Sequence, residues 1–337
     1  MGEAVRTSAP VGRPVPAKLT AARDSFIRSP VIRRVPKPEL CLALLTLLLA
    51  ACGSAGGGEA SSTSSTSSTG TGGSSGTSGT AEPTGEASST GPALDEPCAG
   101  DVLFGRPVAK TGLGPDMCGP VCSCGGAPWE APEYGEDEIA ALLQRELLDP
   151  PAALLADPYA GPAPEPGAPD EVCAVIPEGL QYRLKTYASA AAAQADGATP
   201  THFGACGLCS SLADLAVYMR YPDLGAPVTQ CGIDNLAGPM EAHLECLAAL
   251  GFTPVCAQIW YYNTVNTRSK CAKTCFPLID APYHTPDGAL NECLQCDEDL
   301  SGPIFKKVAG RTRRNTGLAS SLCRPCSEVH PLLHQYP

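Results

Sequence analysis

The sequence predicts a mainly α-helical domain, with at most a small α+β content, which disulfide bonds hold together outside the cytoplasm. Three observations predict it. An apolar leader near the N-terminus directs export, a Ser/Thr/Gly-rich stretch over residues 53–95 follows it, and the remaining chain combines helical periodicity with many cysteines. Disulfide bonds persist in exported proteins and are rare in the cytosol.

The leader ends in a run of twelve almost wholly apolar residues, Leu40–Ala51. Three basic residues precede this run: Arg33, Arg34 and Lys37. A basic segment before a short apolar run is typical of an export signal, and the run is too short to span a bilayer. Residues 1–51 are therefore predicted to be a signal peptide. Residues 1–30 make it long, so they are either a real extension or the result of a misassigned translation start.

The end of the leader, Leu49-Ala50-Ala51-Cys52, resembles the lipobox of bacterial lipoproteins. The resemblance implies that the Cys52 thiol is acylated and that Cys52 becomes the N-terminus after cleavage. The implied partner is a membrane, reached through this lipid anchor, in which each buried methylene contributes about 0.8 kcal/mol. Gly53 at the next position implies the outer membrane or cell surface of a bacterial cell envelope. The alternative is a plain secretory signal with an incidental cysteine.

The residues after the leader divide into three regions by composition. Residues 52–95 hold the lipidated cysteine and a low-complexity stretch that cannot build a core, so they are predicted to be a disordered linker. A flexible coil of this length reaches about 35–40 Å. Residues 96–170 form a small Cys/Pro/Gly-rich segment with one helix and an acidic connector. Residues 171–337 form the Cys-rich, mainly helical domain.

Acidic residues outnumber basic ones. The chain carries 23 Lys and Arg against 35 Asp and Glu, which gives a net charge of −12. Eight of the basic and three of the acidic residues precede Cys52, so the part after the leader is near −17. This charge argues against nucleic acid as a partner and against electrostatic adhesion to anionic lipid.

The cysteine count predicts the covalent frame. The chain has 18 cysteines, of which two, Cys41 and Cys52, lie at the leader, so sixteen remain. An even number in an oxidising compartment predicts eight disulfides, each contributing about 2–4 kcal/mol. The sequence leaves their connectivity open.

Helical spacing of apolar residues predicts helices over residues 136–148, 209–221, 239–250, 257–267, 289–296 and 303–309. Ser211 with Asp214 resembles a capping box at the start of the second of these helices. Polar and apolar residues alternate over residues 181–187, which predicts a strand.

A C-x-x-C motif, Cys206-Gly207-Leu208-Cys209, directly precedes a predicted helix. A thiol at a helix N-terminus has a lowered pKa, which suits redox chemistry. The motif resembles that of thioredoxin-like oxidoreductases, which implies attack by Cys206 and resolution by Cys209. The structural alternative is that each cysteine is oxidised to a different partner.

Two further C-x-x-C pairs, 293/296 and 323/326, allow a metal hypothesis. Cys323, Cys326, His330 and His334 have spacings at which thiolates and imidazoles bind zinc. Outside the cytosol, thiols meet oxidants first, so no metal and no other cofactor is expected and zinc binding stays a lesser alternative.

One basic cluster interrupts the acidic chain: Lys306, Lys307, Arg311, Arg313 and Arg314. Such a cluster is suited to an anionic glycan or an acidic envelope protein, because guanidinium groups bind carboxylates and phosphates in a bidentate manner. The alternative is a solvated turn that pairs with the domain's own carboxylates.

The motifs for phosphate-binding loops, serine hydrolases, zinc peptidases and dinucleotide binding are absent from the sequence. This absence favours a non-enzymatic role and leaves an enzyme open. The predicted function is therefore a cell-envelope lipoprotein that displays a disulfide-stapled binding or structural domain. The alternatives are an extracytoplasmic thiol-disulfide oxidoreductase and, less favoured, a zinc-binding domain.

Overall fold

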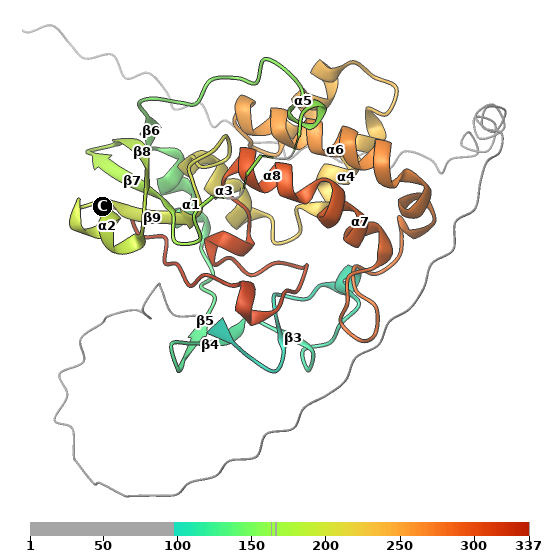
Figure 1. Ribbon diagram of the computed structural model, residues 1–337, viewed down its shortest axis with the longest axis horizontal. Coiled ribbons are helices and arrows are strands. Elements are labelled where there is room, and N and C mark those ends of the chain that lie inside the picture. Colours follow the sequence, from blue (N-terminus) through green and yellow to red (C-terminus); the bar gives the residue numbers. More distant parts are fainter. Residues whose placement is uncertain (1–97, 163, 166, 337) are drawn as a thin grey trace, which may run out of the picture. The chain divides into compact units, whose positions relative to one another are not determined.

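The computed structural model describes residues 98–162, 164–165 and 167–336, and these form a mixed α+β fold (Figure 1). Within this range, eight α-helices and nine strands in three sheets are present. The prediction of a mainly α fold is therefore wrong. The predicted leader, the linker and Cys52 lie outside the described residues.

The largest sheet has four strands in the order β6-β8-β7-β9. Their bounds are β6 Glu146–Leu147, β7 Val172–Glu178, β8 Gln181–Tyr187 and β9 Thr199–Phe203. Strand β7 is antiparallel to both β8 and β9, and β6 is parallel to β8. The β7–β8 hairpin turns at Gly179, whose φ of 71° is a left-handed conformation that favours glycine.

Two small sheets lie in the N-terminal part of the described chain. One has the order β1-β4-β5, with β1 Cys98–Ala99, β4 Val121–Cys124 and β5 Ala127–Glu130. The other pairs β2, Leu103–Phe104, with β3, Cys118–Gly119. Trp129 of β5 stacks on Phe104 with ring centroids 5.5 Å apart, so these short strands share a core of their own.

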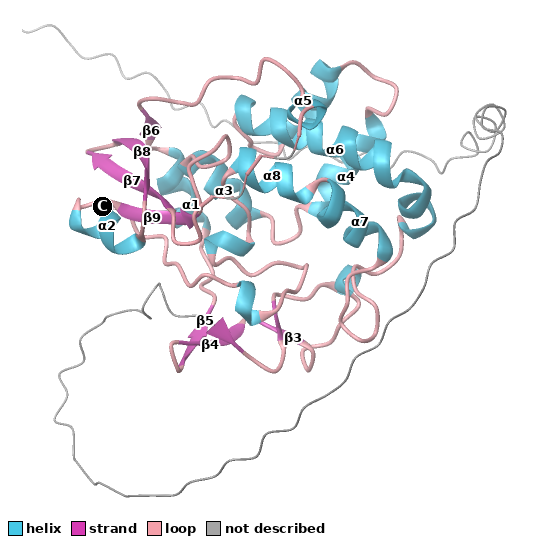
Figure 2. Ribbon diagram, viewed as in Figure 1, coloured by secondary structure: helices cyan, strands magenta, loops and turns pink. Residues whose placement is uncertain are grey.

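The helices are α1 Glu136–Leu143, α2 Ala190–Ala195, α3 Leu212–Arg220, α4 Gly225–Asp234, α5 Met240–Ala249, α6 Pro254–Cys275, α7 Glu292–Leu300 and α8 Gly302–Ala309. Helices α4, α5, α7 and α8 all contact α6, which is therefore the central helix of this half (Figure 2). One face of the large sheet packs on α2, and residues of its other face share a core with α1 and α3.

The sequence identified most helices correctly. Each of the six predicted segments overlaps a helix, although residues 257–267 cover only the middle of α6, and α2 and α4 were not predicted. The strand predicted over residues 181–187 matches β8, Gln181–Tyr187. The N-cap half of the expected capping box at α3 is present, because the Ser211 hydroxyl accepts a hydrogen bond from the Asp214 backbone N–H at 3.0 Å. The Asp214 carboxylate accepts from the Ser211 hydroxyl at 2.6 Å instead of from the Ser211 backbone N–H.

The error in fold class came from strands without a clean alternating pattern. Residues Val172–Val175 of β7 are all buried, as expected for a central strand, and periodicity alone does not separate such a run from a helix. Pro177 in the same strand also argues against a central position. The proline is tolerated because it lies beyond Val175, the last β7 residue that pairs with β9.

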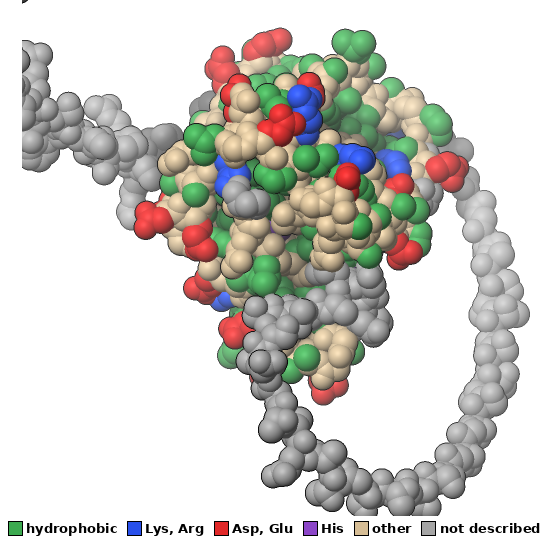
Figure 3. Space-filling view, turned by 90° about the vertical axis from the view of Figure 1, so that its left-hand side faces the viewer, with side chains coloured by type: hydrophobic (Ala, Val, Ile, Leu, Met, Phe, Trp, Pro, Cys, Tyr) green, Lys and Arg blue, Asp and Glu red, His purple; other side chains and the backbone are tan. Residues whose placement is uncertain are grey.

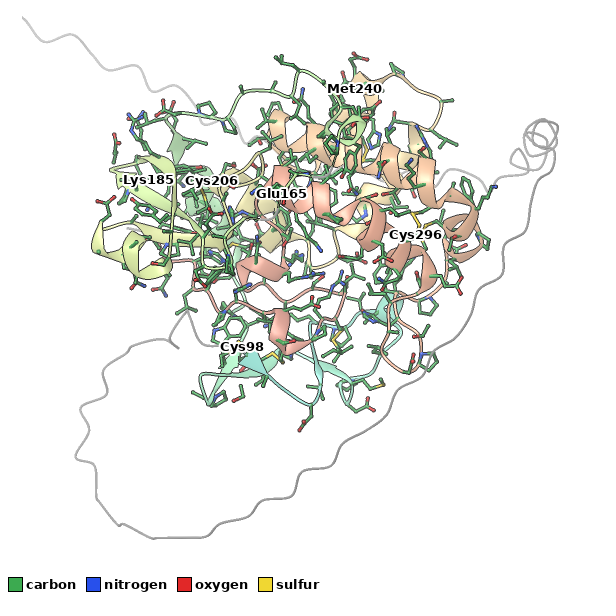
Figure 4. All side chains as sticks on the ribbon, viewed as in Figure 1. Cys98, Glu165, Lys185, Cys206, Met240 and Cys296 are labelled. Carbon is green, nitrogen blue, oxygen red and sulfur yellow. A yellow bond between two sulfur atoms is a disulfide. The ribbon has the colours of Figure 1, made fainter. Side chains whose placement is uncertain are left out.

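Eight disulfides link all sixteen cysteines of the described chain, which confirms the prediction of a disulfide-rich domain. The pairs are Cys98–Cys124, Cys118–Cys323, Cys122–Cys326, Cys173–Cys206, Cys209–Cys256, Cys231–Cys246, Cys271–Cys296 and Cys275–Cys293. Each cysteine of the three C-x-x-C motifs bonds to a partner outside its own motif. Figure 4 labels two of them, Cys206 beside the sheet and Cys296 on α7.

This connectivity is testable by peptide mapping. The unreduced domain, alkylated under denaturing conditions, should take up no alkyl group, because every thiol of residues 98–336 is oxidised. Proteolysis should yield Cys206 linked to Cys173, and Cys209 linked to Cys256. A peptide with a Cys206–Cys209 bond, or an alkylated Cys209, contradicts the prediction.

Candidate ligand cavity and the predicted site residues

The predicted redox pair lies in the loop between β9 and α3. Cys206 is bonded to Cys173 of β7, and Cys209 is bonded to Cys256 in the first turn of α6. The two cysteines are therefore not bonded to each other. Cys209 is fully buried. The loop joins the sheet to the central helix through one covalent bond on each side.

The residues of the metal hypothesis are separated into different contacts. Cys323 and Cys326 are bonded to Cys118 and Cys122. His330 stacks on Phe203, and the His334 ring contacts the Tyr336 hydroxyl and the Thr316 carbonyl, each at 2.9 Å. Across residues 98–336, no group of three or more His, Cys, Asp or Glu side chains is arranged to hold a metal ion.

Arg311 of the basic cluster is completely buried. Its guanidinium donates to the Cys209 carbonyl at 3.0 Å, to the Ser210 carbonyl at 2.9 Å, and to the carbonyl and hydroxyl of Thr201 at 2.9 and 2.8 Å. Burial lowers its pKa, and no solvent-facing group remains on it. Arg311 therefore holds β9 against the loop that carries the C-x-x-C motif.

A buried Ser–His contact lies beside Arg311, and the sequence analysis missed it. The His202 Nε2 atom is 2.7 Å from the Ser210 hydroxyl, and its Nδ1 atom is 2.9 Å from the Phe203 carbonyl. Burial, with the neighbouring charge of Arg311, lowers the pKa of His202 well below its usual value. Both side chains are inaccessible, so the contact stabilises the loop and offers a substrate no approach.

Most of the remaining basic cluster lines a cavity. Lys306, Arg313 and Arg314 lie on its wall, whereas Lys307 is exposed and does not line it. The cavity has a volume of about 620 Å³ and is bounded by α4, α6, α7, α8 and the segment after α8. Binding sites for small molecules typically measure about 300–1,000 Å³. On the molecular face that Figure 3 presents, basic side chains are few and lie among acidic and apolar ones.

Aromatic side chains form the apolar wall of the cavity. The Trp260 ring packs edge-on against Phe305, with centroids 4.6 Å apart, and lies 6.5 Å from the ring of Tyr218. Leu224, Val228 and Leu318 extend this wall. Such packing fixes the shape of the cavity in the absence of a ligand.

A charged cluster forms another part of the wall. The Glu298 carboxylate lies 2.9 Å from Lys306 Nζ and 3.2 Å from a guanidinium nitrogen of Arg314, and it also pairs with Arg324. Burial by itself raises the pKa of Glu298, but the charges of Arg324, Lys306 and Arg314 together hold it at about 2. The next residue, Asp297, is half-buried, and the desolvation of its carboxyl raises its pKa despite a hydrogen bond from Thr267.

Two side chains of the wall, Arg313 and Trp260, have buried nitrogen atoms. The Arg313 Nε atom is buried and has no hydrogen-bond partner among the described residues. The Trp260 indole N–H is also buried and lies beside the Tyr218 side chain. The other two guanidinium nitrogens of Arg313 donate to the carbonyls of Ala319, Tyr218 and Tyr221. Arg313 Nε and Trp260 Nε1 are both inaccessible, so neither offers a hydrogen bond to a molecule in the cavity.

The contribution of Arg311 to the stability of the fold can be tested by unfolding. Arg311→Gln should lower the free energy of unfolding by at least about 3 kcal/mol, because it leaves buried carbonyl groups without donors. Lys307→Gln is the matched control, and at this exposed position the change should stay within about 0.5 kcal/mol. Denaturant titration measures both. Equal stability of the two variants contradicts the assignment of Arg311 to the fold.

The cluster around Glu298 predicts a pH dependence of stability. Since its pKa falls from 4.5 to about 2 on folding, ionised Glu298 stabilises the fold above about pH 4.5, and this contribution is lost as the pH falls towards 2. The free energy of unfolding of the wild type should therefore fall by about 2–3 kcal/mol more than that of Glu298→Gln over this range. Parallel curves for the two proteins contradict the prediction.

Comparisons with known proteins give little information on function. The model of a family of unknown function (DUF8771) matches residues 240–332, the range from α5 to the segment after α8. No curated protein and no solved structure matches the chain. Among the described residues, no single helix is long and apolar enough to cross a membrane, although the bent pair Met240–Ala249 and Pro254–Leu278 passes together by length and composition. The matched range includes α6, α7 and α8, and hence much of the cavity wall.

Proposed function

We propose that the chain is a lipid-anchored protein of the bacterial cell envelope whose disulfide-stapled domain binds a small molecule. The observation that carries the binding role is the cavity of about 620 Å³, whose wall combines aromatic side chains with the charged cluster around Glu298. A domain with a purely structural role has no need of an open cavity, because filling such a space with side chains adds stability.

The disulfide frame supports a binding role. Cys271–Cys296 and Cys275–Cys293 both join α6 to α7, and these two helices line the cavity on adjacent sides. Walls that are covalently fixed before binding lose little conformational entropy when a ligand enters. A fully oxidised domain also suits an oxidising compartment, which agrees with the export predicted from the leader.

The leader supports the anchor. The tetrad Leu49-Ala50-Ala51-Cys52 resembles a lipobox and directly precedes the Ser/Thr/Gly-rich linker. Two acyl chains hold a protein firmly on a membrane, and a linker of this composition then separates the binding domain from the lipid surface. The chain would thus present its cavity at the outer membrane or the cell surface.

The anchor is tested by the mass of the N-terminal peptide. The protein from the membrane fraction of an expressing bacterium should begin at Cys52 and carry diacylglycerol on its thiol. Cys52→Ser should abolish both acylation and cleavage at this position, whereas Cys41→Ser, within the apolar run, should leave both unchanged. A mature N-terminus elsewhere, without acyl groups, contradicts the proposal.

A further inference from the structure

We propose that the cavity binds the phosphoryl group of a small phosphate monoester. Lys306, Arg314 and Arg324 would contact the phosphoryl oxygens, and the aromatic wall around Trp260 would contact the rest of the molecule. This inference rests on the proposed binding function and specifies the chemical class of the ligand.

The charge of the cavity wall selects an anion. Six basic residues line the cavity: Lys110, Arg268, Lys306, Arg313, Arg314 and Arg324. Three acidic residues do so: Asp280, Asp297 and Glu298. The wall is thus positive in a chain whose net charge is −12. A positive concave surface of low dielectric attracts and retains anions.

Three of these cations meet at one carboxylate. The Lys306 Nζ and Arg314 Nη2 atoms lie 2.9 and 3.2 Å from the same oxygen of Glu298, Oε2. Arg324 pairs with the other oxygen, Oε1. Because all three contact a single carboxylate, they are close to one another. One phosphoryl group, which has three acceptor oxygens to share, can therefore contact more than one of them.

The cations of this cluster outnumber the carboxylates that pair with them. Among the described residues, only Glu328 pairs with the cluster besides Glu298, at 3.0 Å from Arg314. Three positive charges thus face two negative ones. Burial lowers the pKa of Arg324, the charge of Glu298 opposes this shift, and the charge of Arg314 adds to it. The two guanidinium groups therefore repel each other, and an anion beside them offsets this repulsion.

The three cationic side chains can be reached by a ligand. All three line the cavity, and their exposed fractions are 39% for Lys306, 25% for Arg314 and 18% for Arg324. The Nε and Nη1 atoms of Arg324 and the Nη1 atom of Arg314 make no hydrogen bond to the described residues. Guanidinium and ammonium groups with free N–H groups are the side chains that most often bind phosphate.

The wall beside this cluster suits the body of an ester. Phe305 precedes Lys306 in α8, and its ring packs against Trp260 with centroids 4.6 Å apart. Trp260 is half-buried and lines the cavity, so part of its side chain is open to a ligand. The volume of about 620 Å³ is also that of a small-molecule site, much larger than a lone phosphate ion needs. The geometry therefore favours a phosphate ester over free phosphate.

Two fluorescent probes with the same chromophore test the inference. Methylumbelliferyl phosphate should bind to the purified mature protein, which raises the anisotropy of its fluorescence. The neutral methylumbelliferyl glucoside should bind at least about tenfold more weakly, because it lacks the charge-assisted hydrogen bonds. Equal binding of both probes overturns the inference on the phosphoryl group but leaves the binding function standing. If neither probe binds, the binding function fails with the inference.

Competition separates a phosphate site from general attraction of anions. Inorganic phosphate should displace the bound ester, whereas sodium chloride at the same ionic strength should displace much less, since chloride only screens the charges. Phenyl phosphate should act at a lower concentration than inorganic phosphate, because its ring also contacts the aromatic wall. Equal displacement by phosphate and chloride overturns the site. Equal potency of phenyl phosphate and inorganic phosphate overturns the ester as its ligand.

Three variants assign the binding to this cluster. Lys306→Gln and Lys307→Gln remove one charge each from neighbouring positions of α8, and only Lys306 lines the cavity. Only the first variant should weaken the binding of methylumbelliferyl phosphate, and several-fold. Glu298→Gln should strengthen it several-fold, because the change removes a negative charge from the wall and releases the three cations. An equal effect of both lysine variants, or an affinity of Glu298→Gln that does not rise, overturns the assignment.

Discussion

The arrangement of the fold depends on the loop between β9 and α3, residues 204–211, which we call the joint. Cys206 bonds it to β7 in the sheet, and Cys209 bonds it to α6, the central helix. The Arg311 guanidinium binds the carbonyls of this loop and of β9 together, while the Cys209 N–H donates to the Ala309 carbonyl at 2.8 Å. The sheet, the helices and the end of α8 are therefore held at one point by two covalent bonds and a buried charge. The C-x-x-C motif that suggested redox chemistry is an element of this joint.

The sequence was a good guide wherever local signals and the packing agree. The first five residues of β8 alternate between exposed and less exposed positions, and α3 and α5 have an apolar stripe with a clear start, so periodicity was enough to find them. It was a poor guide where tertiary contacts decide. Helix α4 contains Gly225, Pro227 and Gly232, which are weak helix formers, and it is held by packing. A Cβ atom at Gly232 would lie 2.8 Å from the Thr264 methyl of α6, so glycine there permits the two helices to approach closely.

The site could be predicted only in part, because neighbouring residues of the basic cluster lie in different environments. Within seven positions of the chain, Lys307 is exposed, Arg311 is fully buried in the joint, and Arg313 lines the cavity. Composition marked the cluster as unusual, but only the three-dimensional path of the segment after α8 decides which guanidinium faces which environment. The cavity itself has no local sequence signal, since its wall combines residues of α3, α4, α6, α7 and α8 that lie far apart in the chain.

The joint and the cavity are linked by the same physical constraint. A chain with 5% aromatic residues has limited means to build a large core, and a cavity of about 620 Å³ removes packing contacts from what core there is. Disulfides offset this loss by restricting the unfolded chain, so the open space can persist without collapse. The covalent frame thus makes it physically feasible for this domain to keep an open cavity of this size.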